Sequence, residues 1–109
     1  MKVTITGFAK QQIRETARYI QMEFGRKYRN IFIHKVQDVR RYLAVNPHLG
    51  PIEPLLSDCP TTYRSVVVTK LNKMIYSIAD DHIEVVDLWD CRREPNKQRE
   101  QTIAHNEST

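Results

Sequence analysis

The stretch TTYRSVVVTKLNKMIYSIADDHIEVVDLWDCRREP, residues 61–95, decides the fold. It contains three short apolar runs, Tyr63–Thr69, Lys73–Ala79 and Ile83–Asp90. Each run is rich in Val, Ile, Tyr or Trp, and short polar segments containing Asn or Asp separate them, which is typical of strands joined by tight turns. The stretch therefore predicts an antiparallel three-stranded meander, with the large aromatic Trp89 in the core.

The residues before the meander begin with a predicted strand and helix. A strand over 2–6 places Val3 and Ile5 on one face, at the edge of the sheet as a fourth strand. The helix that follows begins near Gly7 and ends at Gly25, because glycine accepts the left-handed conformation found just past many helix ends. Its apolar stripe, spaced by three and four residues, consists of Ala9, Ile13, Ala17, Ile20 and Phe24.

A second helical period follows at once. Apolar residues recur by threes and fours from Tyr28 to Leu43, and Pro47 ends the helix because it forces Asn46 out of the helical region. Two helices joined by so few residues must run antiparallel. The predicted fold class is therefore α+β, with an antiparallel helical hairpin packed on one face of a three- to four-stranded antiparallel β-sheet.

Length and composition are those of one folded domain. The chain has 109 residues, of which 40% are hydrophobic and 28% charged. We expect a single domain over 1–95 and a polar, flexible tail over 96–109. No run is long enough to span a membrane, and a secretory signal is missing, so the expected location is cytoplasmic. The spacing of Cys59, Cys91 and the four histidines fits no metal site.

Positive charge is the main functional signal. The formal net charge is +4, which favours a polyanionic partner such as nucleic acid or an acidic protein segment. The candidate binding residues are Arg64, Lys70, Lys73, Arg92 and Arg93. If they converge on a sheet face left open by the hairpin, they form an anion site suited to phosphate. The alternative is that Arg64 and Arg92 pair with Glu84 and Asp90 in surface salt bridges.

The order of strand, helical hairpin, meander and basic end resembles the RelE/ParE superfamily of type II toxin–antitoxin toxins. The resemblance covers about residues 3–95. The residues that carry it are Ala9, Ile13, Tyr19-Ile20, Phe24-Gly25, Asn46-Pro47, Gly50, Tyr63–Val68, Lys73–Ile78 and Ile83–Arg93.

The resemblance implies a growth-inhibiting toxin, of the kind linked to plasmid stabilisation, that a cognate antitoxin neutralises in a hetero-oligomer. One branch of the superfamily cleaves messenger RNA on the ribosome without a metal or other cofactor, using basic residues and a proton-transfer residue. The ParE branch poisons DNA gyrase. Neither activity involves a membrane.

Carried over to this sequence, the resemblance places Lys73 where ribonuclease members have an arginine, and Arg92 and Arg93 at their basic pair. These three would be catalytic only in a ribonuclease. Lys70 and Arg64 could replace lysines of the preceding strand. No Tyr or His follows Arg93 until His105, so Glu94 or His82 would have to move the proton.

The missing proton-transfer residue and the long helices favour a ParE-like, noncatalytic gyrase inhibitor. The alternatives are a ribosome-dependent messenger-RNA endoribonuclease and a degenerate, toxin-like binding module. We expect the antitoxin to use acidic and apolar side chains, either on the open sheet face or in a groove beside the helical hairpin.

Overall fold

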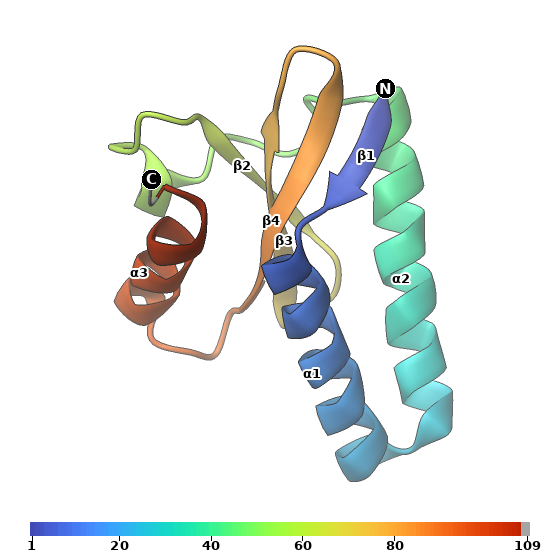
Figure 1. The fold of residues 1–109 in the computed structure, drawn as a ribbon. Coiled ribbons are helices and arrows are strands. Elements are labelled where there is room, and N and C mark those ends of the chain that lie inside the picture. The colour runs from blue at the N-terminus through green and yellow to red at the C-terminus, as the bar shows by residue number, and fades with distance from the viewer. Residues whose placement is uncertain (108–109) are drawn as a thin grey trace.

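The computed structural model describes residues 1–107 and has two layers of helix around one sheet (Figure 1). In chain order the elements are β1 (Lys2–Ile5), α1 (Gly7–Phe24), α2 (Arg26–Val45), the short 3-10 helix η1 (Pro54–Leu56), β2 (Tyr63–Val67), β3 (Asn72–Ile78), β4 (His82–Asp90) and α3 (Pro95–Asn106). None of the helices in residues 1–107 is both long and apolar enough to cross a membrane.

The sheet has the strand order β1-β4-β3-β2. The meander is antiparallel as predicted, with Tyr63 opposite Ser77 and Met74 opposite Leu88. The prediction of a wholly antiparallel sheet is wrong for β1, which runs parallel to β4 and places Val3 opposite Ile83. A parallel neighbour requires a long crossover, and the whole chain between β1 and β4 supplies it.

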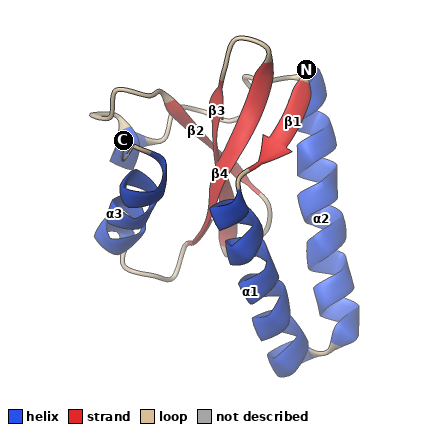
Figure 2. Cartoon of the chain, in the orientation of Figure 1, coloured by secondary structure: helices blue, strands red, loops and turns tan. Residues whose placement is uncertain are grey.

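The helical hairpin covers one face of the sheet, as predicted (Figure 2). The Thr6 side chain accepts a hydrogen bond of 3.1 Å from the Ala9 amide and caps the start of α1. Gly25 has φ of 96° and joins the two helices in a left-handed conformation that disfavours a side chain. The buried stripes of both helices pack on sheet residues such as Met74 and Val85.

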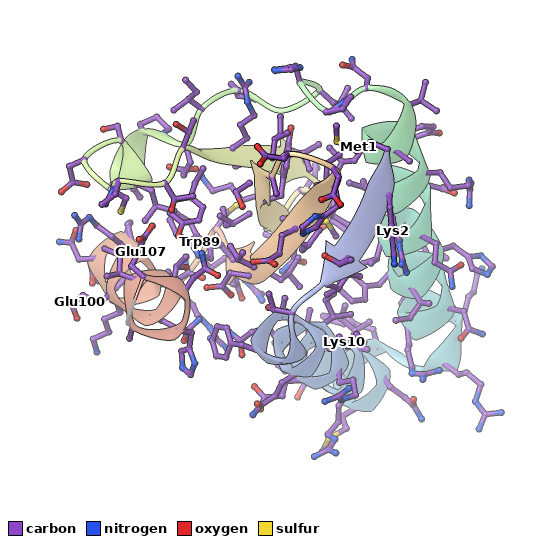
Figure 3. The ribbon with its side chains drawn as sticks, turned by 45° about the horizontal axis from the view of Figure 1, so that its top comes forward. Met1, Lys2, Lys10, Trp89, Glu100 and Glu107 are labelled. Atoms are coloured by element: carbon purple, nitrogen blue, oxygen red, sulfur yellow. The ribbon has the colours of Figure 1, made fainter. Side chains whose placement is uncertain are left out.

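The other face of the sheet is covered as well. Trp89, 1% exposed, lies in a second core beneath α3 and the segment around η1 (Figure 3), together with Leu56 and Ile75. The prediction that Trp89 is a core residue is confirmed. The expectation of an open face is wrong, because a helix that the composition did not predict occupies it.

That helix, α3, replaces most of the predicted flexible tail. Pro95 stands at its first position, and the Glu94 side chain accepts hydrogen bonds from the amides of Asn96 and Lys97. The predicted tail runs to residue 109, and its last two residues lie outside the described part of the chain. The helix has little apolar surface, so composition alone predicted no fixed position for it.

Polar groups hold α3 against the sheet. The carboxylate of Asp87, which is fully buried, accepts hydrogen bonds from the Leu88 amide (2.7 Å), the Trp89 indole N–H (3.2 Å) and the hydroxyl of Thr102 on α3. Burial raises the pKa of Asp87, although these hydrogen bonds act in the opposite direction. Gln98 adds two hydrogen bonds to the backbone of Asp90. The helix is therefore attached by a buried polar network rather than by an apolar stripe.

Candidate binding groove

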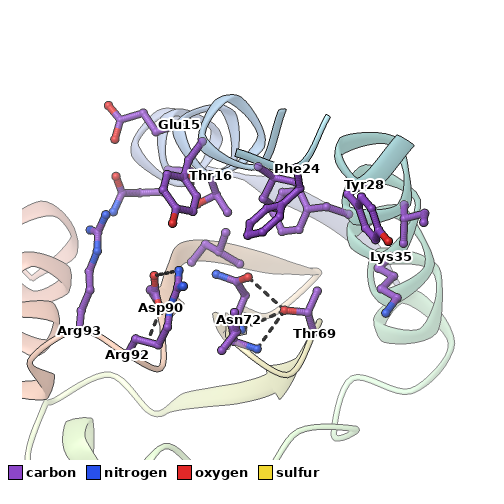
Figure 4. A pocket seen from close by; sticks show the side chains of 17 residues that line it. Glu15, Thr16, Phe24, Tyr28, Lys35, Thr69, Asn72, Asp90, Arg92 and Arg93 are labelled. Atoms are coloured by element: carbon purple, nitrogen blue, oxygen red, sulfur yellow. Dashed lines mark hydrogen bonds and ion pairs between the residues drawn. The ribbon is translucent and has the colours of Figure 1, made fainter. Parts of the chain in front are cut away.

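A groove of about 470 Å³ lies where the helical hairpin extends past the end of the sheet (Figure 4). Its walls come from the second half of α1 and the first half of α2. The turn between β2 and β3, the end of β4 and the two residues Arg92 and Arg93 complete it. The volume falls in the range of small-molecule and peptide-side-chain pockets.

Exposed apolar side chains line this groove. Phe24 is 61% exposed, Tyr28 55% and Tyr19 46%, and Ile31 and Leu71 are exposed beside them. The rings of Phe24 and Tyr28 meet edge to face across the hairpin bend, with centroids 6.4 Å apart. Large apolar side chains gathered on one exposed surface mark an interaction site.

Arg92 forms the polar border of the groove together with Asp90. Its Nε and Nη2 atoms donate to the two carboxylate oxygens of Asp90 at 3.1 and 3.0 Å, and its guanidinium lies 5.8 Å from the centroid of the Tyr19 ring. The ion pair lowers the pKa of Asp90 and raises that of Arg92. The predicted alternative of an Arg92–Asp90 salt bridge is confirmed, so this arginine is oriented and already partnered.

Arg93 also lines the groove, and none of the ion pairs formed within residues 1–107 includes it. The β2–β3 turn opposite is held by the Thr69 hydroxyl, which accepts from the amides of Leu71 and Asn72, both at 3.1 Å. The Cys91 amide donates to the Leu71 carbonyl at 2.7 Å and ties this turn to the end of β4. Hydrogen bonds therefore hold the floor of the groove, and the Arg93 guanidinium at its edge has no ion-pair partner within residues 1–107.

The other predicted site residues do not join Arg92 and Arg93. Arg64 lies opposite Tyr76 in the register of β2 and β3, and its side chain is on the hairpin side of the sheet. There its Nη1 atom donates to the Gly50 carbonyl at 2.8 Å. Lys73 lies opposite Val67 in the same register, and its side chain is on the other side of the sheet. Lys70 is exposed in the turn after β2. The predicted convergence of these cations on one face is wrong, because strand register places Arg64 and Lys73 on opposite faces.

Lys73 is engaged in a structural ion pair. Its ammonium contacts the carboxylate of Glu53, which is 1% exposed, and lies 5.1 Å from the centroid of the Trp89 ring. Burial alone would raise the pKa of Glu53, but hydrogen bonds from Lys73 and the Leu55 amide outweigh it and lower the pKa. The predicted Arg64–Glu84 pair is also wrong, since Arg64 bonds a backbone carbonyl instead.

The residues expected to move a proton lie elsewhere. His82 begins β4, eight residues before Asp90 and therefore roughly 26 Å along the strand from the groove. Glu94 caps α3. His105 stacks on Phe8, with ring centroids 3.8 Å apart. The phenols in the groove, Tyr19 and Tyr28, were not predicted as site residues from the sequence, where Tyr19 only contributed to the family resemblance and Tyr28 only began the apolar period of the second helix.

Comparison with known proteins identifies the fold. No protein-family model matches this sequence, and no curated protein matches it. Among solved structures, a chromosomal ParDE TA system from P. aeruginosa superposes with a TM-score of 0.68 at 12% identity, covering 83% of this chain and 95% of that one. A YoeB dimer from Staphylococcus aureus gives 0.55 at 20% identity over 82% and 94%. A YoeB/ParE toxin from Agrobacterium tumefaciens gives 0.56 at 21% identity over 83% and 98%.

These superpositions cover almost the whole of each matched chain, so the likeness concerns a complete domain. At 12–21% identity the likeness establishes the fold. The α+β fold that the sequence resemblance to the RelE/ParE superfamily predicts is confirmed.

Proposed function

We propose that this protein is the toxin component of a type II toxin–antitoxin module and is neutralised by a cognate antitoxin. The observation that carries the proposal is an exposed apolar groove, bordered by Arg92 and Arg93, on a chain with the fold of the ParE and YoeB structures. A toxin has to present such a surface to two partners in turn, its target and its antitoxin. The fold likeness supports the family, and the groove supports the binding role.

The groove is the antitoxin site in this proposal. Phe24, Tyr28 and Ile31 offer apolar anchors, and beside them Arg93 offers a cation that forms no ion pair within residues 1–107. An amphipathic segment with apolar residues on one side and a carboxylate near its end fits this combination. The alternative site expected from the sequence, an open sheet face, is occupied by α3 and η1.

We infer a noncatalytic mode of action, with DNA gyrase as the favoured target. Lys73 and Arg92, two of the three residues that a ribonuclease would use, are engaged with Glu53 and Asp90. The two proton-transfer candidates predicted from the sequence, His82 and Glu94, do not line the groove. The alternative, a ribosome-dependent messenger-RNA endoribonuclease, is supported by the phenol of Tyr19 next to Arg92, since a phenol and a guanidinium are the groups that such chemistry employs.

Induced expression in a bacterial host tests the toxin role. We expect growth arrest that coexpression of the neighbouring small gene relieves. Purified protein should then inhibit supercoiling by gyrase, and translating messages should stay intact. Cuts at defined codon positions that disappear in the double variant Arg92→Ala, Arg93→Ala would establish the ribonuclease instead. If the induced cells grow normally although the folded protein is present, the toxin role is excluded and the alternative of a degenerate, toxin-like binding module is supported.

A charge substitution in the groove tests the antitoxin site. Tyr28→Asp should weaken antitoxin binding at least tenfold, because it places a carboxylate among the apolar anchors. Val45→Asp is the matched control, since Val45 is 87% exposed at the far end of the same helix. Isothermal titration with the purified antitoxin measures both. Unchanged affinity in Tyr28→Asp would place the antitoxin elsewhere, and an equal loss in both variants would mean that the added charge acts regardless of its position.

A further inference from the structure

Five cations occupy a side of the helical hairpin that the groove does not use. On α1 they are spaced four residues apart. On α2 Arg40 borders a shallow depression between the two helices, and Arg29 lies about three helical turns before it on the same face. We call them the hairpin cation surface: Lys10, Arg14, Arg18, Arg29 and Arg40. Lys10, Arg14 and Arg40 line the depression directly. Figure 3 labels Lys10 on the part of α1 that adjoins α2.

No carboxylate neutralises these charges within residues 1–107, although Arg40 donates to the Val3 carbonyl at 2.9 Å and Arg29 to the side-chain oxygen of Asn30 at 3.5 Å. None of the ion pairs among residues 1–107 involves a member of the hairpin cation surface. The nearby acids are used elsewhere: Asp38 pairs with Arg41, and Glu15 lies at the groove and accepts from Gln11. Like charges four residues apart on a helix destabilise it. Lys10, Arg14 and Arg18 therefore weaken α1, and within residues 1–107 no ion pair of these three side chains offsets the repulsion.

The spacing and chemistry of the row suit a phosphate backbone. Residues four apart on a helix are separated by about 6 Å along its axis, which is comparable to the distance between successive phosphates of one strand. Four of the five cations are arginines, whose planar guanidinium can grip a phosphate with two hydrogen bonds. Sequence-independent nucleic-acid binding depends on contacts of this kind.

The same surface is poorly suited to a protein partner. The apolar residues in the depression, Ile5, Ile13, Ile33 and Val36, are buried or half-buried, so they offer no exposed anchor. Stable protein interfaces have an apolar core with aromatic residues. Of the exposed aromatics on this hairpin, Tyr19, Phe24 and Tyr28 line the groove and Tyr42 lies beside Gly50 and Val67, so none of the four lines the depression.

We propose that the hairpin cation surface binds the sugar–phosphate backbone of nucleic acid. The proposal does not depend on the toxin assignment, because it uses a different side of the hairpin from the groove. Binding there would leave the groove free, so the protein could contact nucleic acid and a protein partner at the same time.

Fluorescence anisotropy with short labelled duplexes tests this. A DNA duplex and an RNA duplex of the same sequence are both tested; the proposal requires binding to at least one of them, and the tighter of the two identifies the source of the phosphate. In the full chain the logarithm of the binding constant should fall with the logarithm of salt concentration, with a slope near −4.5 for five contacts. The double variant Arg14→Gln, Arg18→Gln should bind at least tenfold more weakly, and its slope should be shallower by about 1.8.

The matched control is Lys27→Gln, Lys97→Gln, which removes the same charge from exposed positions outside the surface. It should keep the slope of the unmodified protein, and thermal melts should show that both double variants are folded. Equal losses in the two variants would mean that only net charge matters and would overturn the proposal. So would the absence of duplex binding, or tighter binding of polyglutamate than of either duplex. Growth arrest and antitoxin binding are measured separately, so neither result depends on this one.

Discussion

Thr102→Val should loosen α3 from the sheet. Thr102 is fully buried, its hydroxyl donates to the Asp87 carboxylate, and its oxygen accepts from the Trp89 indole at 2.9 Å. Valine has nearly the same shape, so the substitution removes these hydrogen bonds without opening a cavity. The carboxylate then stays buried with fewer donors, which costs far more than a lost contact at the surface.

A hydrogen bond to a charged group contributes about 1.5–3 kcal/mol. For a domain of this size each kcal/mol lowers the melting temperature by about 4 °C. The expected decrease for Thr102→Val is therefore about 6–12 °C. The Trp89 indole loses its hydrogen bond to Thr102 but retains the one of 3.2 Å to Asp87, so its N–H stays paired.

Urea unfolding gives the free energy, and hydrogen exchange locates the change. Amides of α3 should exchange faster in Thr102→Val, whereas those of α1 and α2 should change little. Thr102→Ser is the control, because it keeps the hydroxyl and removes one methyl group, worth roughly 1 kcal/mol. If Thr102→Val is as stable as Thr102→Ser, the buried network does not attach α3 and this reasoning is refuted.

Three further substitutions test other contacts. Gly50→Ala should destabilise the protein by about 2 kcal/mol or more, since a Cβ there would lie 2.2 Å from the Ser65 carbonyl oxygen; thermal melts measure this. Lys73→Met should lower the free energy of unfolding, measured in urea, by about 2 kcal/mol, because it leaves the Glu53 carboxylate buried without its cation. The loss is smaller than for a fully buried ion pair because the lysine side chain is 26% exposed. Asp90→Asn should flatten the acid limb of the stability–pH curve. Arg92 lowers the pKa of Asp90 below its ordinary 3.8, so the stability that Asp90 contributes is present above that pH and is lost as the pH falls through the pKa of the folded state.

Each of these has a counterpart that should behave differently. Gly7→Ala meets nothing within 4 Å and should be neutral. The double variant Lys73→Met, Glu53→Gln should recover most of the lost stability, and failure to recover it would show that the two residues act independently. Asp87→Asn should steepen the acid limb of the stability–pH curve, the opposite of Asp90→Asn. Because the pKa of Asp87 is raised in the folded protein, its contribution to stability grows as the pH falls, and the substitution removes that contribution.

The helical hairpin and the meander could be predicted from the sequence because each has an apolar period of its own. The stripes of α1 and α2 and the turns between strands are local signals, and the observed bounds agree with them. The helix α3 could not be predicted in this way, since its buried residues are the polar Gln98 and Thr102. A signal was present in Glu94-Pro95, which forms an N-cap followed by the proline that favours a first helical position.

The candidate site was predicted only in part. Arg92 and Arg93 border the groove, and the Arg92–Asp90 pair follows from residues two apart in the chain. The positions of Arg64 and Lys73 depend on the register between β2 and β3, which no local pattern specifies. The groove itself arises where α1 and α2 extend past the sheet, so its aromatic lining is a tertiary property.

The parallel pairing of β1 with β4 has a consequence for synthesis of the chain. Lys2 leaves the ribosome about 80 residues before its partner His82, so at 5–20 residues per second β1 waits roughly 4–16 s for the strand it joins. The hairpin can form during that interval because its contacts are local. The sheet on which the hairpin packs is complete only after β4 has been synthesised, so a nascent chain that lacks β4 has no finished domain.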